Sequence, residues 1–344
     1  MLMVRLSMSK DKQKKIKNKA IQKTFCITGG NGFIGRKLIE SLLNKGIKLR
    51  VLTRKKEVNF PEVVEVFNGD LTLPDNSLKE FLKGCDVLFH CAGEIRQIEL
   101  MKKLHINGTQ SLIDAVKEES FNAHKIIHWV QLSSCGAYGP PPKKDFEIKR
   151  KINEKTPTNP VNKYEKTKTL SDKLVLNACK NKEMTFTILR PSNVIGSNMT
   201  DQIFYKLSKA LESGYFFFIG KKDATATFVH VHDVVNALVL IASDSRAINQ
   251  IYNLSYDCSW EKMIYRITYL LKLKKPSLRI PAPIILKLLS ILKFFIGKWK
   301  HIPNIEPLIF RTYYSSKKIQ SELNFKFSIA MPEDFNFSTE LNSK

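Results

Sequence analysis

The chain has 344 residues, of which 43% are hydrophobic, so it is long enough for one large domain plus a smaller one, and its composition argues against global disorder. Its net charge of +24 favours anionic partners such as nucleotides, nucleic acid or membrane surfaces. The lysines are spread along the whole chain, without an arginine-rich groove pattern interleaved with aromatics, so we expect no specific nucleic-acid binding. The six cysteines form no CxxC pair and no metal-ligand spacing, which indicates reduced thiols, a cytoplasmic protein and no metal site.

The chain begins with a basic segment, residues 1–22, that has no apolar run of the signal-peptide kind. We interpret it as a disordered tail, and Met8 is an alternative start codon.

Strand and helix patterns alternate from residue 23 to residue 190. The predicted strands are 23–28, 48–52, 63–67, 86–91, 126–132 and 185–189. The clearest helical spacing covers 33–44, 108–117 and 164–179. This alternation predicts a doubly wound, parallel α/β sheet of the Rossmann type over 23–190, with 228–254 returning to it.

The alternation weakens after residue 190. Helical patterns cover 202–212, 260–271 and about 283–295, which predicts a smaller, mostly helical substrate-binding domain formed by 191–227 and 255–344. Its apolar segment Pro281–Gly297 is interrupted by Lys287 and Lys293, so it is too short and too charged for a membrane span. It is either a packed wall of the substrate pocket or an interfacial helix on a membrane.

A glycine turn follows the first predicted strand and opens the first predicted helix. Gly29, Gly32 and Gly35 lie in the run TGGNGFIG, at the spacing of a dinucleotide-binding turn. The helix that follows offers unpaired N–H groups to a pyrophosphate, so this turn predicts an NAD(P) site. The second strand ends in Thr53-Arg54-Lys55-Lys56 where NAD-binding folds usually carry an acidic residue, so we prefer NADP over NAD.

A tyrosine and a lysine one helical turn apart form the predicted catalytic pair. Tyr164 and Lys168 share one helix face, and a nearby ammonium favours the phenolate form of a tyrosine. Ser134 stands at the carboxyl end of a predicted strand, where its hydroxyl can polarise a reacting oxygen, with Ser133 as the alternative.

The order and spacing of these motifs resemble the extended short-chain dehydrogenase/reductase family, in its NAD-dependent epimerase/dehydratase group. The matching runs are TGGNGFIG at 28–35, GDL at 69–71, HCAG at 90–93, NGT at 107–109, SSCGAYG at 133–139, YEKTK at 164–168, RPSNVIG at 190–196, FVHVHDVV at 228–235 and YSSKK at 314–318. The resemblance extends from Thr24 to about Phe327 and also implies a homodimer.

With the motifs above, the resemblance implies a set of site residues. The cofactor residues are Gly29, Gly32, Phe33, Ile34, Gly35, Arg54, Asp70, Leu71, Ala92, Asn107, Tyr164, Lys168 and Pro191. The substrate residues are Ser134, Asn193 and Arg311, and Arg311 stands in for an arginine that nucleotide-sugar epimerases often carry where this chain has Ala226. Dehydratases of the family carry an acidic pair where this chain has Cys135-Gly136, which argues against sugar dehydration.

These features predict hydride transfer at a secondary hydroxyl or keto group. The favoured substrate is a nucleotide sugar, which would make the protein a keto-sugar reductase or a 4-epimerase of polysaccharide biosynthesis. One alternative is a hydroxysteroid- or dihydroflavonol-type dehydrogenase or reductase of a hydrophobic alcohol, associated with a membrane surface. Another is a non-catalytic NAD(P)-binding regulator, against which the intact Tyr164, Lys168 and Ser134 argue.

Overall fold

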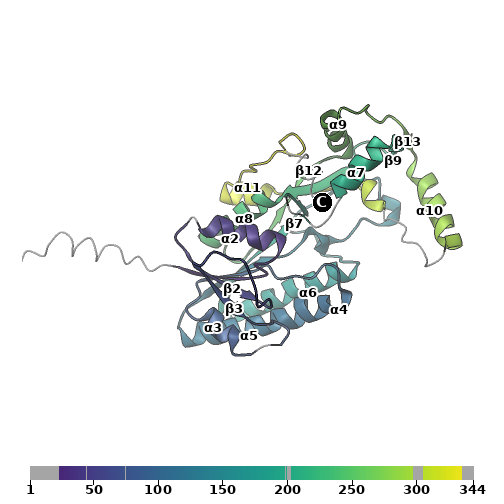
Figure 1. Cartoon of the computed structure of the whole chain (residues 1–344). Coiled ribbons are helices and arrows are strands. Elements are labelled where there is room, and N and C mark those ends of the chain that lie inside the picture. Colours follow the sequence, from purple (N-terminus) through teal and green to yellow (C-terminus); the bar gives the residue numbers. More distant parts are fainter. Residues whose placement is uncertain are drawn as a thin grey trace, which may run out of the picture.

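The computed structural model describes residues 23–334 except 44, 74, 198, 200–202 and 297–304. The expected tail at 1–22 and the end of the apolar segment at Gly297 lie outside these residues. Figure 1 shows a body built on one large sheet, with a second group of helices and short strands gathered at one end.

The large sheet has seven parallel strands in the order β11-β7-β5-β4-β1-β2-β3. They are β1 (Thr24–Thr28), β2 (Lys48–Thr53), β3 (Val64–Asn68), β4 (Val87–His90), β5 (Ile127–Leu132), β7 (Met184–Pro191) and β11 (Gln250–Leu254). The six strands predicted before residue 190 are confirmed within two residues at each end. The order reverses between β1 and β4, and open α/β sheets bind their ligands at such a switch point.

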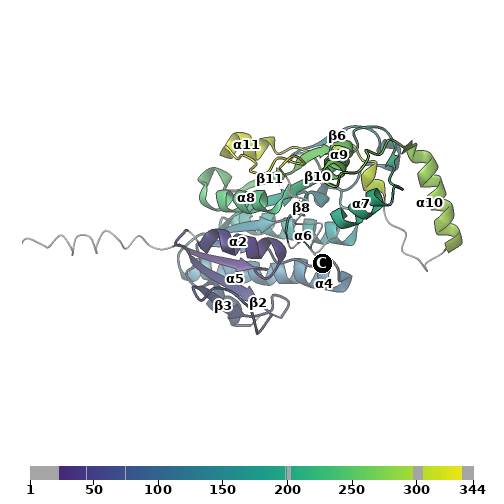
Figure 2. The same cartoon turned by 45° about the horizontal axis from the view of Figure 1, so that its top comes forward.

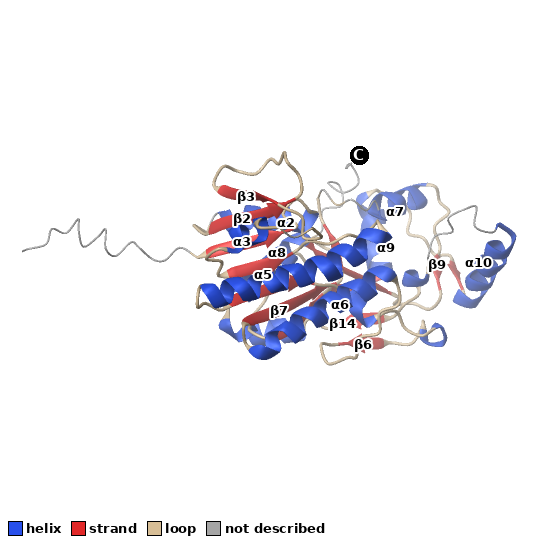
Figure 3. Cartoon of the chain, turned by 90° about the horizontal axis from the view of Figure 1, so that it is seen from below, coloured by secondary structure: helices blue, strands red, loops and turns tan. Residues whose placement is uncertain are grey.

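Helices cover both faces of this sheet, as the doubly wound class requires. On one face α2 (Phe33–Leu43), α8 (Val231–Ser243) and α11 (Lys317–Leu323) contribute to a shared core. On the other face lie α3 (Ser77–Leu82), α5 (Thr109–Asn122) and α6 (Lys163–Ala178), the last two extended across the strands in Figure 3. Leu38, Ile39 and Leu42 of α2 are buried at helical spacing, which is the pattern that predicted this helix.

The second group contains α7 (Ile203–Glu212), α9 (Trp260–Leu270) and α10 (Ala282–Ile296), which confirms the three helices expected there. Three short sheets accompany them (Figure 2). In the first, β10 (Thr225–His230) pairs with β8 (Asn193–Ile195) on one side and β12 (Tyr256–Ser259) on the other. The second pairs β9 (Phe218–Ile219) with β13 (Arg279–Ile280), and the third pairs β6 (Arg150–Ile152) with β14 (Thr312–Tyr314). Most of these strands have two to four residues, too few to show a period in the sequence.

The core of the second group is aromatic: Phe204, Phe228 and Trp260 are buried against one another. Among the described residues, no helix has both the length and the apolar content that crossing a membrane requires.

Candidate active site

The turn from β1 into α2 can be formed only by glycines. Gly29 has a φ of +74°, and a Cβ there would lie 2.5 Å from the backbone nitrogen of Ala92. A Cβ on Gly35 would collide with the carbonyl oxygen of Gly29, to which the Gly32 N–H donates a hydrogen bond of 2.9 Å. The turn is therefore closed against the end of β4, and α2 starts directly behind it with its first N–H groups unpaired within the helix.

A pocket lies at the switch point, where the carboxyl ends of β1, β2, β3 and β4 meet. Its lining includes six of the predicted cofactor residues: Gly29, Gly32, Arg54, Asp70, Leu71 and Ala92. Of the other predicted residues, Phe33 and Ile34 open α2, Gly35 packs beneath the turn, and Pro191 ends β7.

The end of β2 is basic. The guanidinium of Arg54 is 4.0 Å from the Asp70 carboxylate, and the Arg54 side chain is 57% exposed. Thr53 turns inward instead and accepts a hydrogen bond of 2.6 Å from the Asn31 amide. Arg54 and Lys55 thus line the pocket where a cofactor ribose would lie, and the glycine turn fits a pyrophosphate in the same pocket.

The catalytic pair predicted from the sequence lies at the start of α6. A capping box formed by Asn162 and Glu165 fixes the first turn of this helix. Lys168 is buried one turn further on, and its Nζ donates a hydrogen bond of 2.7 Å to the carbonyl of Leu132 at the end of β5. Ser134 follows that strand, and its Oγ accepts a hydrogen bond of 3.0 Å from the Gly136 N–H.

The surroundings of Tyr164 disfavour its phenolate form, which is opposite to the shift expected from a nearby ammonium. Burial raises its pKa above 10, a side-chain hydrogen bond with Ser134 lowers it, and the negative charges of Asp172 and Glu165 raise it. Burial lowers the pKa of Lys168, while the Asp172 charge opposes that shift. Tyr164 is therefore poised to give a proton to an oxygen that reaches the Ser134 hydroxyl.

His105 is a residue of this site that the sequence prediction missed. It is buried in a π-helical turn, Lys103–Gly108, where its ring meets that of Tyr164 edge-on at 5.9 Å. Its Nε2 accepts a hydrogen bond of 2.9 Å from the Glu94 N–H, and its Nδ1 is 2.8 Å from the Thr167 hydroxyl. Burial lowers the pKa of His105 to about 3, so its ring is neutral beside Tyr164. The predicted Asn107 is exposed on the same turn.

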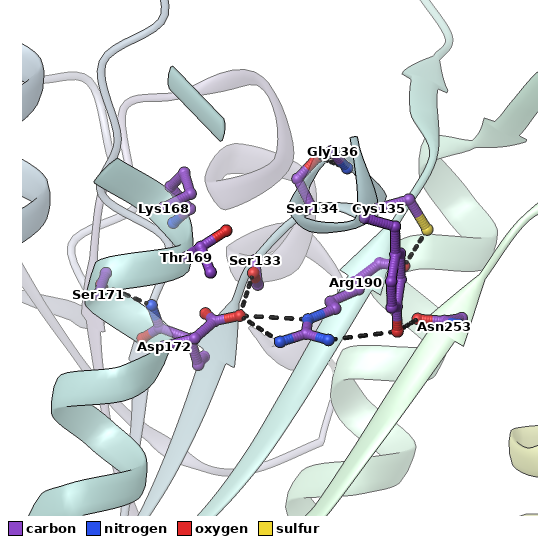
Figure 4. A network of polar contacts seen from close by, with 12 residues as sticks. Ser133, Ser134, Cys135, Gly136, Lys168, Thr169, Ser171, Asp172, Arg190 and Asn253 are labelled. Atoms are coloured by element: carbon purple, nitrogen blue, oxygen red, sulfur yellow. Dashed lines mark hydrogen bonds and ion pairs between the residues drawn. The ribbon is translucent and has the colours of Figure 1, made fainter. Parts of the chain in front are cut away.

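A buried ion pair ties α6 to the end of β7, as Figure 4 shows. The Asp172 Oδ2 accepts hydrogen bonds from Arg190 Nη2 at 3.0 Å, from Arg190 Nε at 3.2 Å and from the Ser133 hydroxyl at 2.8 Å. Arg190 also donates to Tyr138, whose hydroxyl donates to Asn253 on β11. Because Ser133 and Asp172 neighbour Ser134 and Lys168, this network sets how the serine and the helix lie relative to each other.

The other two predicted substrate residues, Asn193 and Arg311, belong to the second group of elements. Asn193 is exposed on β8, and its amide donates to the backbone of β10 at 3.0 Å. Arg311 precedes β14, with its Nη2 3.7 Å from an Asp223 carboxylate oxygen and its Nη1 donating to the Glu147 carbonyl at 3.4 Å. Ala226 is fully buried in β10.

A Rossmann sheet with a glycine turn at its switch point, together with a serine beside a Tyr/Lys helix, defines the class of nucleotide-dependent oxidoreductases. The chain belongs to the NAD dependent epimerase/dehydratase family, whose sequence profile matches residues 25–255. It is thus an NAD(P)-dependent oxidoreductase of the extended short-chain dehydrogenase/reductase type.

The proteins to which the chain is similar differ in the activities that their names give. It is 28% identical over 221 residues to a sterol-4-alpha-carboxylate 3-dehydrogenase from Bos taurus, covering 63% of this chain and 59% of that enzyme. With the Mus musculus enzyme of the same name it is 24% identical, covering 89% of this chain and 87% of the relative. Among solved structures, UDP-glucose 4-epimerase from Thermotoga maritima has a TM-score of 0.69 at 16% identity, covering 92% of this chain and 98% of the other.

Proposed function

We propose that the protein reduces a ketone to a secondary alcohol with NADPH, and that Tyr164 is the proton donor. The observation that carries this proposal is the half-buried Tyr164 beside Ser134, with the buried Lys168 one helical turn away and hydrogen-bonded to the Leu132 carbonyl. The reductive direction needs a proton donor, and a protonated tyrosine hydroxyl beside a serine that can hold the reacting oxygen is placed to be one.

Each residue of the set has a distinct role. The Ser134 hydroxyl would hold the substrate oxygen, and Tyr164 would protonate it. Lys168, which donates a hydrogen bond to the Leu132 carbonyl, would hold the nicotinamide ribose. When bound, the dinucleotide supplies the hydride. Gly29, Gly32 and the N-terminus of α2 would hold its pyrophosphate, and Arg54 would hold a 2′-phosphate.

The substrate class that we propose is a hydrophobic cyclic ketone or alcohol. A nucleotide sugar would need a cation for its diphosphate. The Arg311 guanidinium already interacts with the Asp223 carboxylate and the Glu147 carbonyl. The buried Ala226, which stands where nucleotide-sugar epimerases often have an arginine, carries no charge. The sterol dehydrogenases support the same class, as does a farnesyl-dihydroquinoline-oxide ketoreductase from Stigmatella aurantiaca that is 28% identical over 224 residues.

A nucleotide sugar is the second candidate, as the sequence first favoured. Asn193 is exposed on β8, and solved structures of this fold include complexes with UDP-glucose and UDP-glucuronic acid. A cycle of oxidation and re-reduction by the same residues would then make the protein a 4-epimerase with retained NAD.

We also propose that the protein is a cytoplasmic homodimer. The cytoplasm suits its free cysteines, and a dimer interface that includes α6 would cover Leu170, which is 44% exposed.

The test has two parts, nucleotide release and substrate turnover. Denaturing the purified protein releases any bound nucleotide for identification, and near-stoichiometric NAD would favour the epimerase. Turnover is then followed by NADPH and NADH consumption with a panel of sterol-like and flavonoid-like ketones and of keto-sugar nucleotides. We expect consumption of NADPH with a cyclic ketone, slowed by about two to four orders of magnitude in Tyr164→Phe. Turnover of keto-sugar nucleotides alone would overturn the substrate class.

A further inference from the structure

Helix α10 is apolar on both of its sides. Its inner side is buried in a small core, where Ala282 and Ile285 pack with Phe146, Ile219 and Ile309. Its outer side carries Ile284, Leu288, Ile291 and Leu292, whose side chains are 37% to 58% exposed. Their spacing of four, three and one residues places these four side chains on a continuous stripe.

This stripe lies at the edge of the molecule. Figures 1 and 2 both show α10 at the far end of the second group of elements, with the body of the protein on one side of it only. A helix that is hydrophobic all round is normally buried on all sides, and a contiguous exposed apolar face marks a binding surface.

The sequence before and along α10 is basic. Residues 262–296 contain eight lysines and arginines and no acidic residue. Lys272, Lys274 and Lys275 are exposed in the segment before β13, and Lys287 is exposed on α10 among the apolar side chains. The exposed Leu278 lies between this lysine segment and the helix.

We propose that the α10 stripe (Ile284, Leu288, Ile291 and Leu292), with Lys287 and the lysine segment 272–275, binds the surface of an anionic lipid bilayer. The apolar side chains would enter the boundary between head groups and acyl chains, and the lysines would contact the anionic head groups. The inner side of α10 stays packed on the protein, so the helix lies in the plane of the membrane surface rather than across it.

A lipid surface fits these residues better than a protein partner does. Protein interfaces are depleted in lysine relative to the rest of the surface, whereas Lys287 is exposed beside Ile284 at the edge of the stripe. Helices that lie on membranes combine such lysines with large aliphatic side chains. The proposal does not depend on which ketone the active site reduces, because no residue of the stripe belongs to the cofactor pocket.

Vesicle flotation of the full chain tests the proposal. One set of vesicles contains phosphatidylcholine alone, and the other contains phosphatidylcholine with phosphatidylglycerol. We expect binding to the anionic vesicles that weakens with added salt and is at least tenfold weaker on phosphatidylcholine alone.

Two variants separate the apolar and the charged contributions. Leu288→Glu with Ile291→Glu should lower the partition coefficient at least tenfold, and Lys272, Lys274 and Lys275 changed to Gln should lower it about a hundredfold, at about fivefold for each lysine. The matched control, Val63→Glu with Phe121→Glu, changes two exposed apolar residues on the main body and should bind like the wild type. NADPH binding and the thermal unfolding temperature of each variant verify its folding.

Three results would overturn the proposal. The first is no binding of the wild type to anionic vesicles at low salt. The second is equal binding by the Leu288→Glu, Ile291→Glu variant, which would leave no role for the apolar stripe. The third is a wild-type dimer that this variant converts to a monomer without any vesicle binding, which would make the stripe an interface between two copies of the chain.

Discussion

The Asp172–Arg190 pair offers the sharpest test of how the active site is held together. Asp172→Asn keeps the shape of the side chain, and the amide oxygen can replace Oδ2 as the acceptor for Arg190 and Ser133. The amide nitrogen then takes the place of Oδ1, a buried atom for which the structure shows no hydrogen-bond partner. The substitution therefore removes a negative charge and little else, and leaves the Arg190 charge buried without its counter-ion.

The expected cost follows from burial and distance. The two side chains are only 5% and 1% exposed, and Nη2 is 3.0 Å from Oδ2. Opposite charges about 3 Å apart attract by roughly 5 kcal/mol at an effective dielectric constant of about 20. Removing one partner of a buried pair costs about 3–5 kcal/mol, so we expect a loss of that size in the free energy of unfolding. The pKa of Lys168 should fall further, since the Asp172 charge now raises it.

Urea unfolding followed by circular dichroism measures this loss, with an exposed ion pair as the control. Lys79 and Glu118 are 2.6 Å apart, but their side chains are 56% and 45% exposed, so Glu118→Gln should cost no more than about 1 kcal/mol. Asp172→Leu combined with Arg190→Met should recover much of the loss, because no buried charge then remains unpaired. If Asp172→Asn cost as little as Glu118→Gln, the pair would not hold α6 against β7.

Three further changes test the cofactor pocket and the pH dependence. Gly29→Ala should abolish NADPH binding, because its Cβ would meet the backbone of Ala92. The control Gly214→Ala, at φ +73° with open space around it, should cost only about 1–2 kcal/mol of stability and leave NADPH binding intact. Equal effects of the two substitutions on NADPH binding would contradict the steric argument. Arg54→Glu should lower the preference for NADPH over NADH at least tenfold in titrations of both nucleotides, while Lys56→Glu, outside the pocket lining, should not. Burial raises the pKa of Asp257 from 3.8 to about 7, so between these pH values the folded protein keeps a proton that the unfolded chain releases. The free energy of unfolding should therefore fall as the pH rises from about 4 to 7, by up to roughly 1.4 kcal/mol per pH unit. Asp257→Asn should flatten that slope in urea unfolding at several pH values, and an unchanged slope would refute the assignment.

The cofactor pocket was predictable because its residues follow consecutive strands. Gly29, Arg54, Asp70 and Ala92 each come one or two residues after a strand of the sheet, and the carboxyl ends of parallel strands meet at one edge of the sheet. Tyr164 and Lys168 were predictable because one helical turn separates them. Strand and helix periodicity predicted where these side chains lie, and the resemblance to the family implied the roles of Asp70 and Ala92.

The supporting contacts were not predictable in this way, because they join residues far apart in the chain. His105 contacts Thr167 across 62 residues, and no local pattern marks it. Asp172 had one signal, its position one turn after Lys168 on the same helix, but its partner Arg190 follows from the packing of α6 on β7. For α10 the sequence left packing and membrane contact open, and the structure assigns packing to the inner half and leaves the outer half exposed.

Whether Tyr164 supplies the proton is decided by comparing the turnover rates of Tyr164→Phe and the wild type on the ketone that the panel identifies. NADPH affinity is measured alongside, because the phenyl ring of the variant keeps the contact that the Tyr164 ring makes with His105 and should leave the pocket intact. We predict unchanged NADPH binding and a turnover number lower by about two to four orders of magnitude. Turnover of Tyr164→Phe at the wild-type rate would contradict the assignment of Tyr164 as the proton donor.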